Sequence, residues 1–168
     1  SEEEIADFVS LVKEGKISLS ASYLNMTEAI DGEIYTRAQR RITSRLASFG
    51  LHPDVALTSD VNGYAWGFCD MLAAQGARLL VSQINQTHGH VPFEHPHTPF
   101  LWEGAHGSRI GVWVSDHYMT GNMIGLEPVA RASSDAFLPK AEEKVPEYLR
   151  DLAAKGYPYS FLPLGVSG

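Results

Sequence analysis

The chain has 168 residues, of which 44% are hydrophobic and 20% are charged, a composition typical of a globular protein that can bury a core. Its formal net charge of -7 disfavours nucleic-acid binding, because an acidic surface repels a phosphate backbone. The longest apolar runs fall well short of the ~20 residues that cross a bilayer, so we expect no membrane association.

The single cysteine, Cys69, rules out an internal disulfide and is expected to be buried in a helix. This cysteine usage fits a reducing compartment, and a cytoplasmic location is therefore favoured. The sequence opens directly on Ser1 and an amphipathic pattern, so we expect the chain to begin inside a longer protein. That expectation leaves the location open, because any targeting segment would then be missing from this sequence.

One pattern recurs along the sequence: a helix that ends at a glycine and is followed by a short apolar strand. The predicted order is a helix over 2–14, a strand over 17–23, a helix from the cap at Thr27 to Gly50, a strand over 55–58, a helix over 63–75, a strand over 78–82, a helix through 148–153 and a strand over 159–162. Such alternation predicts an α/β fold with a parallel sheet and crossover helices. Four strands are too few to close a barrel, so the sheet is either open or part of one.

A different region, residues 83–138, separates the third and fourth of these units. Two strands are predicted there, over 100–103 and 109–114, and the turn 104–107 could join them as a hairpin. The surrounding loops are rich in His, Pro, Gly and Asn. Long loops inside a compact domain are usually functional. We therefore interpret residues 1–168 as one segment of a domain that carries a loop-rich insertion.

The most prominent candidate for chemistry is Asp60, which follows the predicted strand over 55–58 almost directly. In parallel α/β folds the site lies at the carboxyl ends of the strands, and a carboxylate there can act as nucleophile, base or metal ligand. The alternative is that Asp60 caps the helix predicted to start near Gly63. Position alone does not decide between the two.

Four histidines form a second candidate cluster, namely His88, His90, His95 and His97. Two His-X-His pairs suggest a metal site. However, this spacing places both imidazoles on one side only in an extended strand, and Pro92 and Pro96 make the stretch a loop. A polar loop that faces sugar or water is therefore favoured.

Aromatic and polar side chains supply candidates for sugar binding. The candidate substrate-binding residues are Trp102, Glu103, Asp116 and Tyr118. Trp102 is the best stacking platform, because Glu103 and Gly104 follow it near a strand end. Trp66, on a predicted helix, and Trp113, on an apolar strand, are expected to pack in the core.

Three segments together resemble the family-38 glycoside hydrolases, the α-mannosidases and their relatives. Residues 58–64 (Thr-Ser-Asp-Val-Asn-Gly-Tyr) with 76–80 resemble the segment that carries the nucleophile. Residues 99–110 are similar to the family's Phe-X-Trp-X-Gly-X-Asp-Gly-Ser segment, and 12–17 to the helix, glycine and strand that precede the active strand. Order and spacing match over about residues 5–126.

The resemblance implies a retaining hydrolase that acts on an α-glycoside with the help of zinc, on a seven-stranded β/α barrel of which this chain is the central part. Asp60 is then both the nucleophile and a zinc ligand. A retaining glycosidase also needs a second carboxylate about 5 Å away as acid/base. A metal can grip sugar hydroxyls and favour the shape that the ring has in the transition state.

The sequence departs from the family at Tyr64, where His is usual, and at His106, where Asp is usual. The family's His-X-Asp zinc motif lies N-terminal to the residues present here, and its remaining zinc histidine and acid/base lie beyond Gly168. We therefore expect the chain to need the rest of the catalytic domain and to be inactive alone. Two alternatives stay open: a non-catalytic carbohydrate-binding or scaffold module, and a metal-dependent deacetylase-like barrel using the histidines of 88–97.

Overall fold

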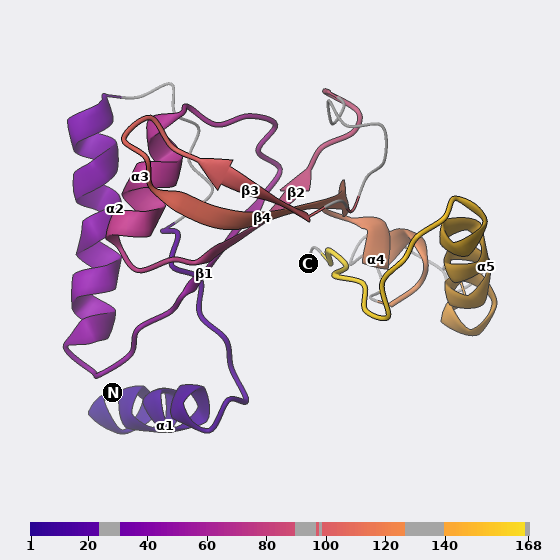
Figure 1. The fold of residues 1–168 in the computed structure, drawn as a ribbon. Coiled ribbons are helices and arrows are strands. Elements are labelled where there is room, and N and C mark those ends of the chain that lie inside the picture. Colours follow the sequence, from indigo (N-terminus) through magenta and orange to yellow (C-terminus); the bar gives the residue numbers. More distant parts are fainter. Residues whose placement is uncertain (24–30, 90–96, 98, 127–139, 167–168) are drawn as a thin grey trace.

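The computed structural model describes residues 1–23, 31–89, 97, 99–126 and 140–166 (Figure 1). Its helices are α1 (Glu2–Lys13), α2 (Gly32–Ala47), α3 (Gly67–Ala74), α4 (Thr120–Met123) and α5 (Ala141–Ala154). Its strands are β1 (Val55–Ser59), β2 (Leu79–Ile84), β3 (Pro99–Glu103) and β4 (Arg109–His117). None of the helices described here combines the length and the apolar composition that a membrane span requires.

The four strands of the described residues form one sheet in the order β1-β2-β4-β3. Strands β1, β2 and β4 are parallel, whereas β3 pairs with β4 as an antiparallel hairpin. The α/β class, the mostly parallel sheet with alternating helices and the hairpin are thus confirmed. In the part of the chain that the structure describes the sheet is open, so the barrel stays a prediction.

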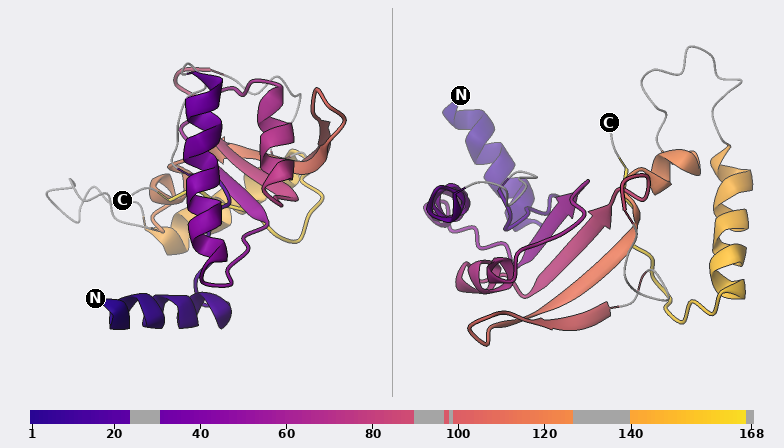
Figure 2. Two further views of the ribbon diagram at one scale, coloured as in Figure 1. Left: turned by 90° about the vertical axis from the view of Figure 1, so that its left-hand side faces the viewer. Right: turned by 90° about the horizontal axis from the view of Figure 1, so that it is seen from above.

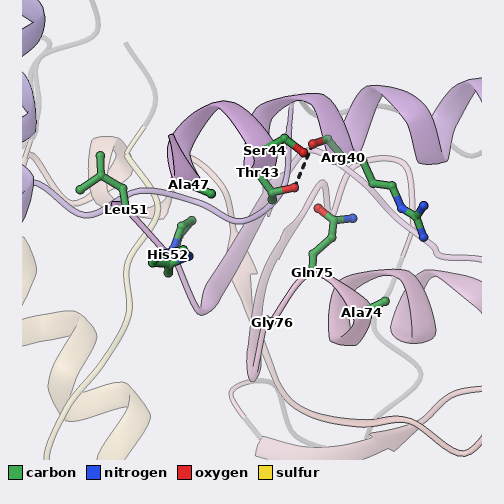
Figure 3. Close-up of a pocket in the computed structure, with 10 residues that line it drawn as sticks. Arg40, Thr43, Ser44, Ala47, Leu51, His52, Ala74, Gln75 and Gly76 are labelled. Carbon is green, nitrogen blue, oxygen red and sulfur yellow. Dashed lines mark hydrogen bonds between the residues drawn. The ribbon is translucent and has the colours of Figure 1, made fainter. Parts of the chain in front are cut away.

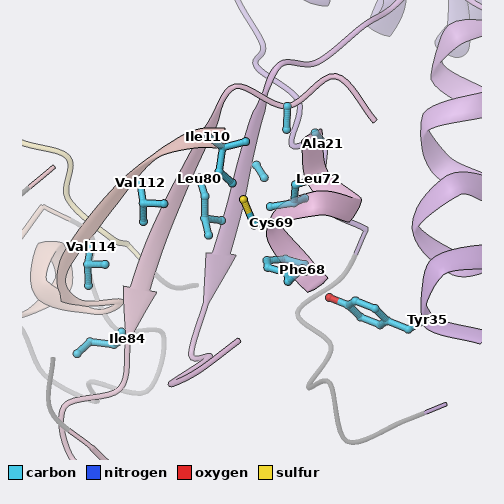
Figure 4. Packing of buried hydrophobic residues seen from close by; sticks show 12 residues of the cluster. Ala21, Tyr35, Phe68, Cys69, Leu72, Leu80, Ile84, Ile110, Val112 and Val114 are labelled. Carbon is cyan, nitrogen blue, oxygen red and sulfur yellow. The ribbon is translucent and has the colours of Figure 1, made fainter. Parts of the chain in front are cut away.

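The hydrophobic core lies between α3 and one face of the sheet, and α2 packs on the outside (Figures 2 and 4). Cys69 and Leu72 of α3 meet Leu80 of β2 and Ile110 of β4, and all four are at most 1% exposed. Cys69 is buried as expected. Burying such aliphatic side chains contributes roughly 1.5–3 kcal/mol each, so this layer fixes the sheet and therefore the positions of its strand ends.

The opposite face of the sheet carries exposed apolar side chains. Leu57 of β1 and Leu101 of β3 are 45% and 62% exposed. They belong to this face because side chains alternate along a strand, and their neighbours Ala56 and Trp102 pack toward α3. If another segment covered this face, burial of these side chains would extend the hydrophobic core to both sides of the sheet.

The strand predicted over 17–23 is absent, although this segment runs beside β1. The Ala21 N–H donates to the Val55 carbonyl over 2.8 Å. The Ser20 hydroxyl then accepts from the Leu57 N–H over 3.0 Å, in place of the main-chain carbonyl that a sheet ladder needs. The prediction was wrong because a serine side chain can replace the backbone as hydrogen-bond partner.

The strand predicted over 159–162 is also absent from the described structure. Tyr159 and Phe161 instead pack their rings on Trp113 of β4, with centroids 5.5 and 5.2 Å from the indole. Aromatic packing here takes the place of strand pairing. The expected burial of Trp113 is confirmed at 4% exposure, whereas Trp66 is 66% exposed and the core prediction for it was wrong.

Helix α2 begins at an Asp31 cap, whose carboxylate accepts from the Glu33 and Ile34 N–H groups. The predicted cap, Thr27, lies outside the described residues. The inward face of α2 includes the fully buried Gln39, whose amide donates to the Tyr23 carbonyl and accepts from the Tyr23 N–H. Gln39 thereby ties down the end of the segment that runs beside β1.

The hairpin turn between β3 and β4 is held by Asp70 of α3. Its carboxylate accepts from the main-chain N–H of His106 over 3.1 Å and contacts the His106 imidazole over the same distance. A side chain at Gly104 would lie 2.6 Å from the Asp70 carboxylate, so glycine is required there. His106 therefore has a structural role at this turn.

Candidate functional site

Polar side chains gather where the parallel strands β1, β2 and β4 end. Because these strands run in the same direction, their carboxyl ends share one edge of the sheet. The polar residues at or just beyond this edge are Asp60, Asn62, Asn85, Gln86, Asp116 and Tyr118. Of the predicted site residues, Asp60, Asp116 and Tyr118 are thus placed at one edge.

Asp60 is exposed and directly follows β1. Its φ of 62° lies in the left-handed region, where a non-glycine residue is uncommon. Its N–H donates to the Gln83 carbonyl over 2.9 Å, which extends the β1-β2 pairing by one bond. Helix α3 begins only at Gly67 with Trp66 as its N-cap, so the alternative that Asp60 caps this helix is excluded.

The Asp60 carboxylate has one oxygen held by a neighbour. The Asn85 amide nitrogen donates to Asp60 Oδ1 over 2.9 Å. Among the residues that the structure describes, none donates to Oδ2. The second oxygen is therefore available to a ligand at the exposed edge.

Asp116 stands in a bulge of β4. The β2-β4 register shifts so that Gln83 faces Ser115 and Ile84 faces His117, which leaves Asp116 as the extra residue. Its Oδ2 accepts from the Tyr148 hydroxyl over 2.5 Å and lies 3.1 Å from His97 Nε2. Its Oδ1 accepts from the Gln86 amide over 2.8 Å.

The environment of Asp116 keeps this carboxyl ionised. Burial by itself raises the pKa, but the hydrogen bonds from His97, Tyr148 and Gln86 outweigh it, and the pKa falls from 3.8 to about 2. Burial of the Tyr148 side chain and its hydrogen bond to Asp116 raise the pKa of Tyr148. Asp116 is therefore a charged acceptor that connects β4, residue 97 and α5, and it is not a proton donor at neutral pH.

Residues Asn85 and Gln86 connect the two carboxylates. Both follow β2, which lies between β1 and β4, and their amides donate to Asp60 and to Asp116 respectively. This link was not predicted. The only signal for it in the sequence was the position of the pair directly after an apolar strand.

Tyr118 continues the chain just beyond β4. Its N–H donates to the Ile84 carbonyl over 3.1 Å, and its ring stacks on His117 with centroids 4.4 Å apart. The C-terminal segment lies against it, since a side chain at Gly165 would come within 2.3 Å of the Tyr118 carbonyl oxygen. The predicted role of Tyr118 in substrate binding stays a prediction.

Trp102 and Glu103 lie at the opposite end of the sheet from Asp60, where the parallel strands begin. Strand β3 is antiparallel, so its end pairs with the start of β4, where Glu103 faces Arg109. The Glu103 carboxylate pairs with the Arg109 guanidinium at 2.6 Å, and the Trp102 ring packs 6.1 Å from Tyr64. The structure therefore does not bring Trp102 and Glu103 together with Asp60.

The candidate metal cluster lies largely outside the described residues, which include His88 and His97 but not His90 or His95. His97 is 1% exposed and its Nε2 faces Asp116. Within the described ranges no group of three or more His, Cys, Asp or Glu side chains could hold a metal ion. The metal prediction for these histidines is thus neither supported nor overturned.

A pocket of about 440 Å³ lies at the edge opposite Asp60, between α2 and the end of α3 (Figure 3). Arg40, Thr43 and Gln75 contribute polar groups to it, and His52 lies on the loop that precedes β1. In parallel α/β folds this amino-terminal edge serves stability rather than chemistry. The pocket is therefore separate from the candidate site.

Comparisons with known proteins support the fold. No known protein-family profile and no curated protein matches the chain. Among solved structures, the chain is similar to the crystal structure of 4-alpha-glucanotransferase from Thermococcus litoralis, with a TM-score of 0.54 and 17% identity. The match covers 90% of this chain and 23% of that protein, so the chain spans less than a quarter of its length.

Proposed function

We propose that this chain belongs to the catalytic domain of a retaining glycoside hydrolase that acts on an α-glycoside, with Asp60 as the nucleophile. One observation carries the proposal. Asp60 presents an exposed carboxylate at the carboxyl edge of a parallel sheet, with one oxygen held by Asn85 and the other free of any partner among the described residues. This is the arrangement that a carboxylate nucleophile needs.

The reaction would proceed in two displacements. Asp60 Oδ2 attacks the anomeric carbon, the bond to the leaving-group oxygen breaks, and that oxygen takes a proton from an acid. Water, deprotonated by the same group, then cleaves the glycosyl ester and releases Asp60. The configuration of the anomeric carbon is inverted twice and so retained.

Asp116 does not fit the role of this acid. It stands two strand spacings from β1, or about 10 Å along the sheet, whereas the two carboxylates of a retaining enzyme lie about 5 Å apart. Its low pKa and three hydrogen-bond donors also keep it ionised. Asp116 is proposed instead to bind substrate hydroxyls or to shape the site, together with Tyr118.

Two lines of support narrow the class of substrate. The structural similarity is to an enzyme named as a 4-alpha-glucanotransferase, and this favours a carbohydrate-active role. The α-mannosidase-like specificity rests on the sequence around Asp60 and on the segment 99–110. Trp102 and Glu103 remain candidate substrate contacts only for a carbohydrate that reaches the opposite edge.

Zinc forms part of the proposal, with Asp60 as one ligand. A zinc site needs three or four protein ligands, and the described residues offer no such set around Asp60. These residues alone therefore do not fit a zinc site, and the other ligands would come from elsewhere in the catalytic domain.

The configuration of the product tests the proposed reaction. The full-length protein is expected to release a sugar from an aryl α-mannoside or a related α-glycoside, and the first product is expected to be the α-anomer. Proton NMR spectra recorded within minutes, before mutarotation, would measure this. Initial release of the β-anomer would show inversion and would contradict a covalent role for Asp60.

A non-catalytic carbohydrate-binding module is the second candidate. The observation that favours it is the place of Asp116, the other acidic residue that the described structure puts at this end of the sheet, which lies too far from Asp60 to act as its acid/base. Calorimetric binding of a sugar by the full-length protein, without any release of product, would support this candidate. A deacetylase-like barrel would require metal on the histidines of residues 88–97.

A further inference from the structure

The loop after β1 and the loop after β2 are joined by a reciprocal pair of hydrogen bonds. The Asn62 amide nitrogen donates to the Asn85 carbonyl, and the Asn85 N–H donates to Asn62 Oδ1, both over 2.8 Å. The side-chain amide of Asn62 thus satisfies both main-chain polar groups of Asn85. These two hydrogen bonds close a ring between the Asn62 side chain and the Asn85 main chain, and they fix the position of Asn85 relative to the end of β1.

The main chain at Gly89 packs closely on this hydrogen-bonded pair of asparagines. A side chain at Gly89 would come within 3.0 Å of the Asn62 amide nitrogen. Asn85 itself is only 7% exposed. The Asn85 main chain is therefore held on several sides, and its side chain has little freedom to change direction.

A third contact decides which end of the Asn85 amide faces Asp60. Asn85 Oδ1 accepts from the Thr87 N–H over 3.0 Å and from the Thr87 hydroxyl. Because the oxygen is used by these donors, the nitrogen must face Asp60. Asn85 therefore presents a donor to Asp60 Oδ1 and cannot turn an acceptor toward it without losing both bonds to Thr87.

From this geometry we infer that Asn85 is a positioning residue for Asp60. It holds Oδ1 and so selects Oδ2 as the oxygen that reacts. The inference rests on the proposed function, because it assigns a reacting oxygen to the proposed nucleophile. A carboxylate on an exposed strand end would otherwise rotate about its side-chain bonds, and misplacement of a reacting group by about 1 Å can cost roughly a hundredfold in rate.

The substitution Asn85→Asp tests the inference in the full-length protein. The new carboxylate is isosteric and still accepts from Thr87, but it replaces the donor to Asp60 with an acceptor. We expect kcat to fall by about thirtyfold to a hundredfold while KM stays within about twofold, because the contact acts on the reacting group rather than on substrate binding. Asn85→Ala, which removes the amide, is expected to show the same division between kcat and KM.

A matched control is Gln75→Ala, which removes a side-chain amide from the opposite edge of the sheet and is expected to leave kcat unchanged. If Asp60→Asn is inactive while Asn85→Asp and Asn85→Ala keep full kcat and fold normally, the inference on Asn85 is overturned and the proposed function stands. If Asp60→Asn itself keeps its activity, the proposed function fails first. A rise in KM at constant kcat would assign Asn85 to substrate binding and would also overturn the inference.

Discussion

Replacing Asp60 with Asn is expected to lower kcat of the full-length protein for the proposed hydrolysis by at least about a thousandfold, since an amide cannot form the glycosyl ester. The variant should fold as the parent does. Asn accepts positive φ values more readily than most residues, and its oxygen can still accept from the Asn85 amide. The measurement is steady-state hydrolysis of an aryl α-glycoside, with urea unfolding to confirm unchanged stability.

Asp54→Asn is the matched control for this change. Asp54 precedes β1 just as Asp60 follows it, so the same substitution is made at the two ends of one strand. The Asp54 side chain pairs with Arg78 at an exposed position on the opposite edge. Its removal is expected to leave kcat unchanged. Equal losses in both variants would show a general effect on folding and would count against Asp60 as nucleophile.

The second large effect is expected on stability, at Asp116. The two carboxylate oxygens of Asp116 accept hydrogen bonds from His97, Tyr148 and Gln86. The Asp116→Asn side chain has only one accepting oxygen, so it cannot serve all three donors. We expect the free energy of unfolding to fall by about 2 kcal/mol at pH 7, because the buried His97 and the half-buried Tyr148 lose a charged partner. Urea unfolding of the parent and the variant measures this difference. Tyr148→Phe, which removes one donor, should cost less.

The pH dependence distinguishes an ionised Asp116 from a merely polar one. Its pKa is about 2 in the folded protein and near 3.8 when unfolded, so the unfolded state takes up the proton first as the pH falls. The contribution is complete above pH ~5 and is lost as the pH falls toward ~2. The stability difference between parent and Asp116→Asn should therefore shrink across this window. A difference that is constant from pH 5 to pH 2 would contradict the assignment of the charge.

The sequence correctly predicted that polar residues gather at the carboxyl ends of the parallel strands. The order of strand, helix and strand around residues 55–82 follows from apolar periodicity and terminal glycines, and it placed Asp60 at a strand end correctly. The hairpin of β3 and β4 also followed from local pattern. These features depend on short-range preferences, which a single sequence contains.

The contacts that hold the site could not be predicted in the same way. Asn62 and Asn85 are 23 residues apart, and Tyr148 reaches Asp116 across 32 residues. No local pattern encodes such pairs, because they depend on how loops pack after the sheet has formed. The strand predicted over 17–23 failed for a related reason, since the Ser20 side chain forms hydrogen bonds that periodicity does not reveal.

The most direct measurement is the identification of a covalent glycosyl-enzyme. An activated fluorosugar that forms the ester quickly but releases it slowly should trap the intermediate on the full-length protein. Peptide mass spectrometry is then expected to find one sugar on the peptide that contains Asp60, with fragmentation placing it on the Asp60 side chain and no label in Asp60→Asn. Label on a different carboxylate, or turnover without any label, would contradict the assignment of Asp60 as the nucleophile.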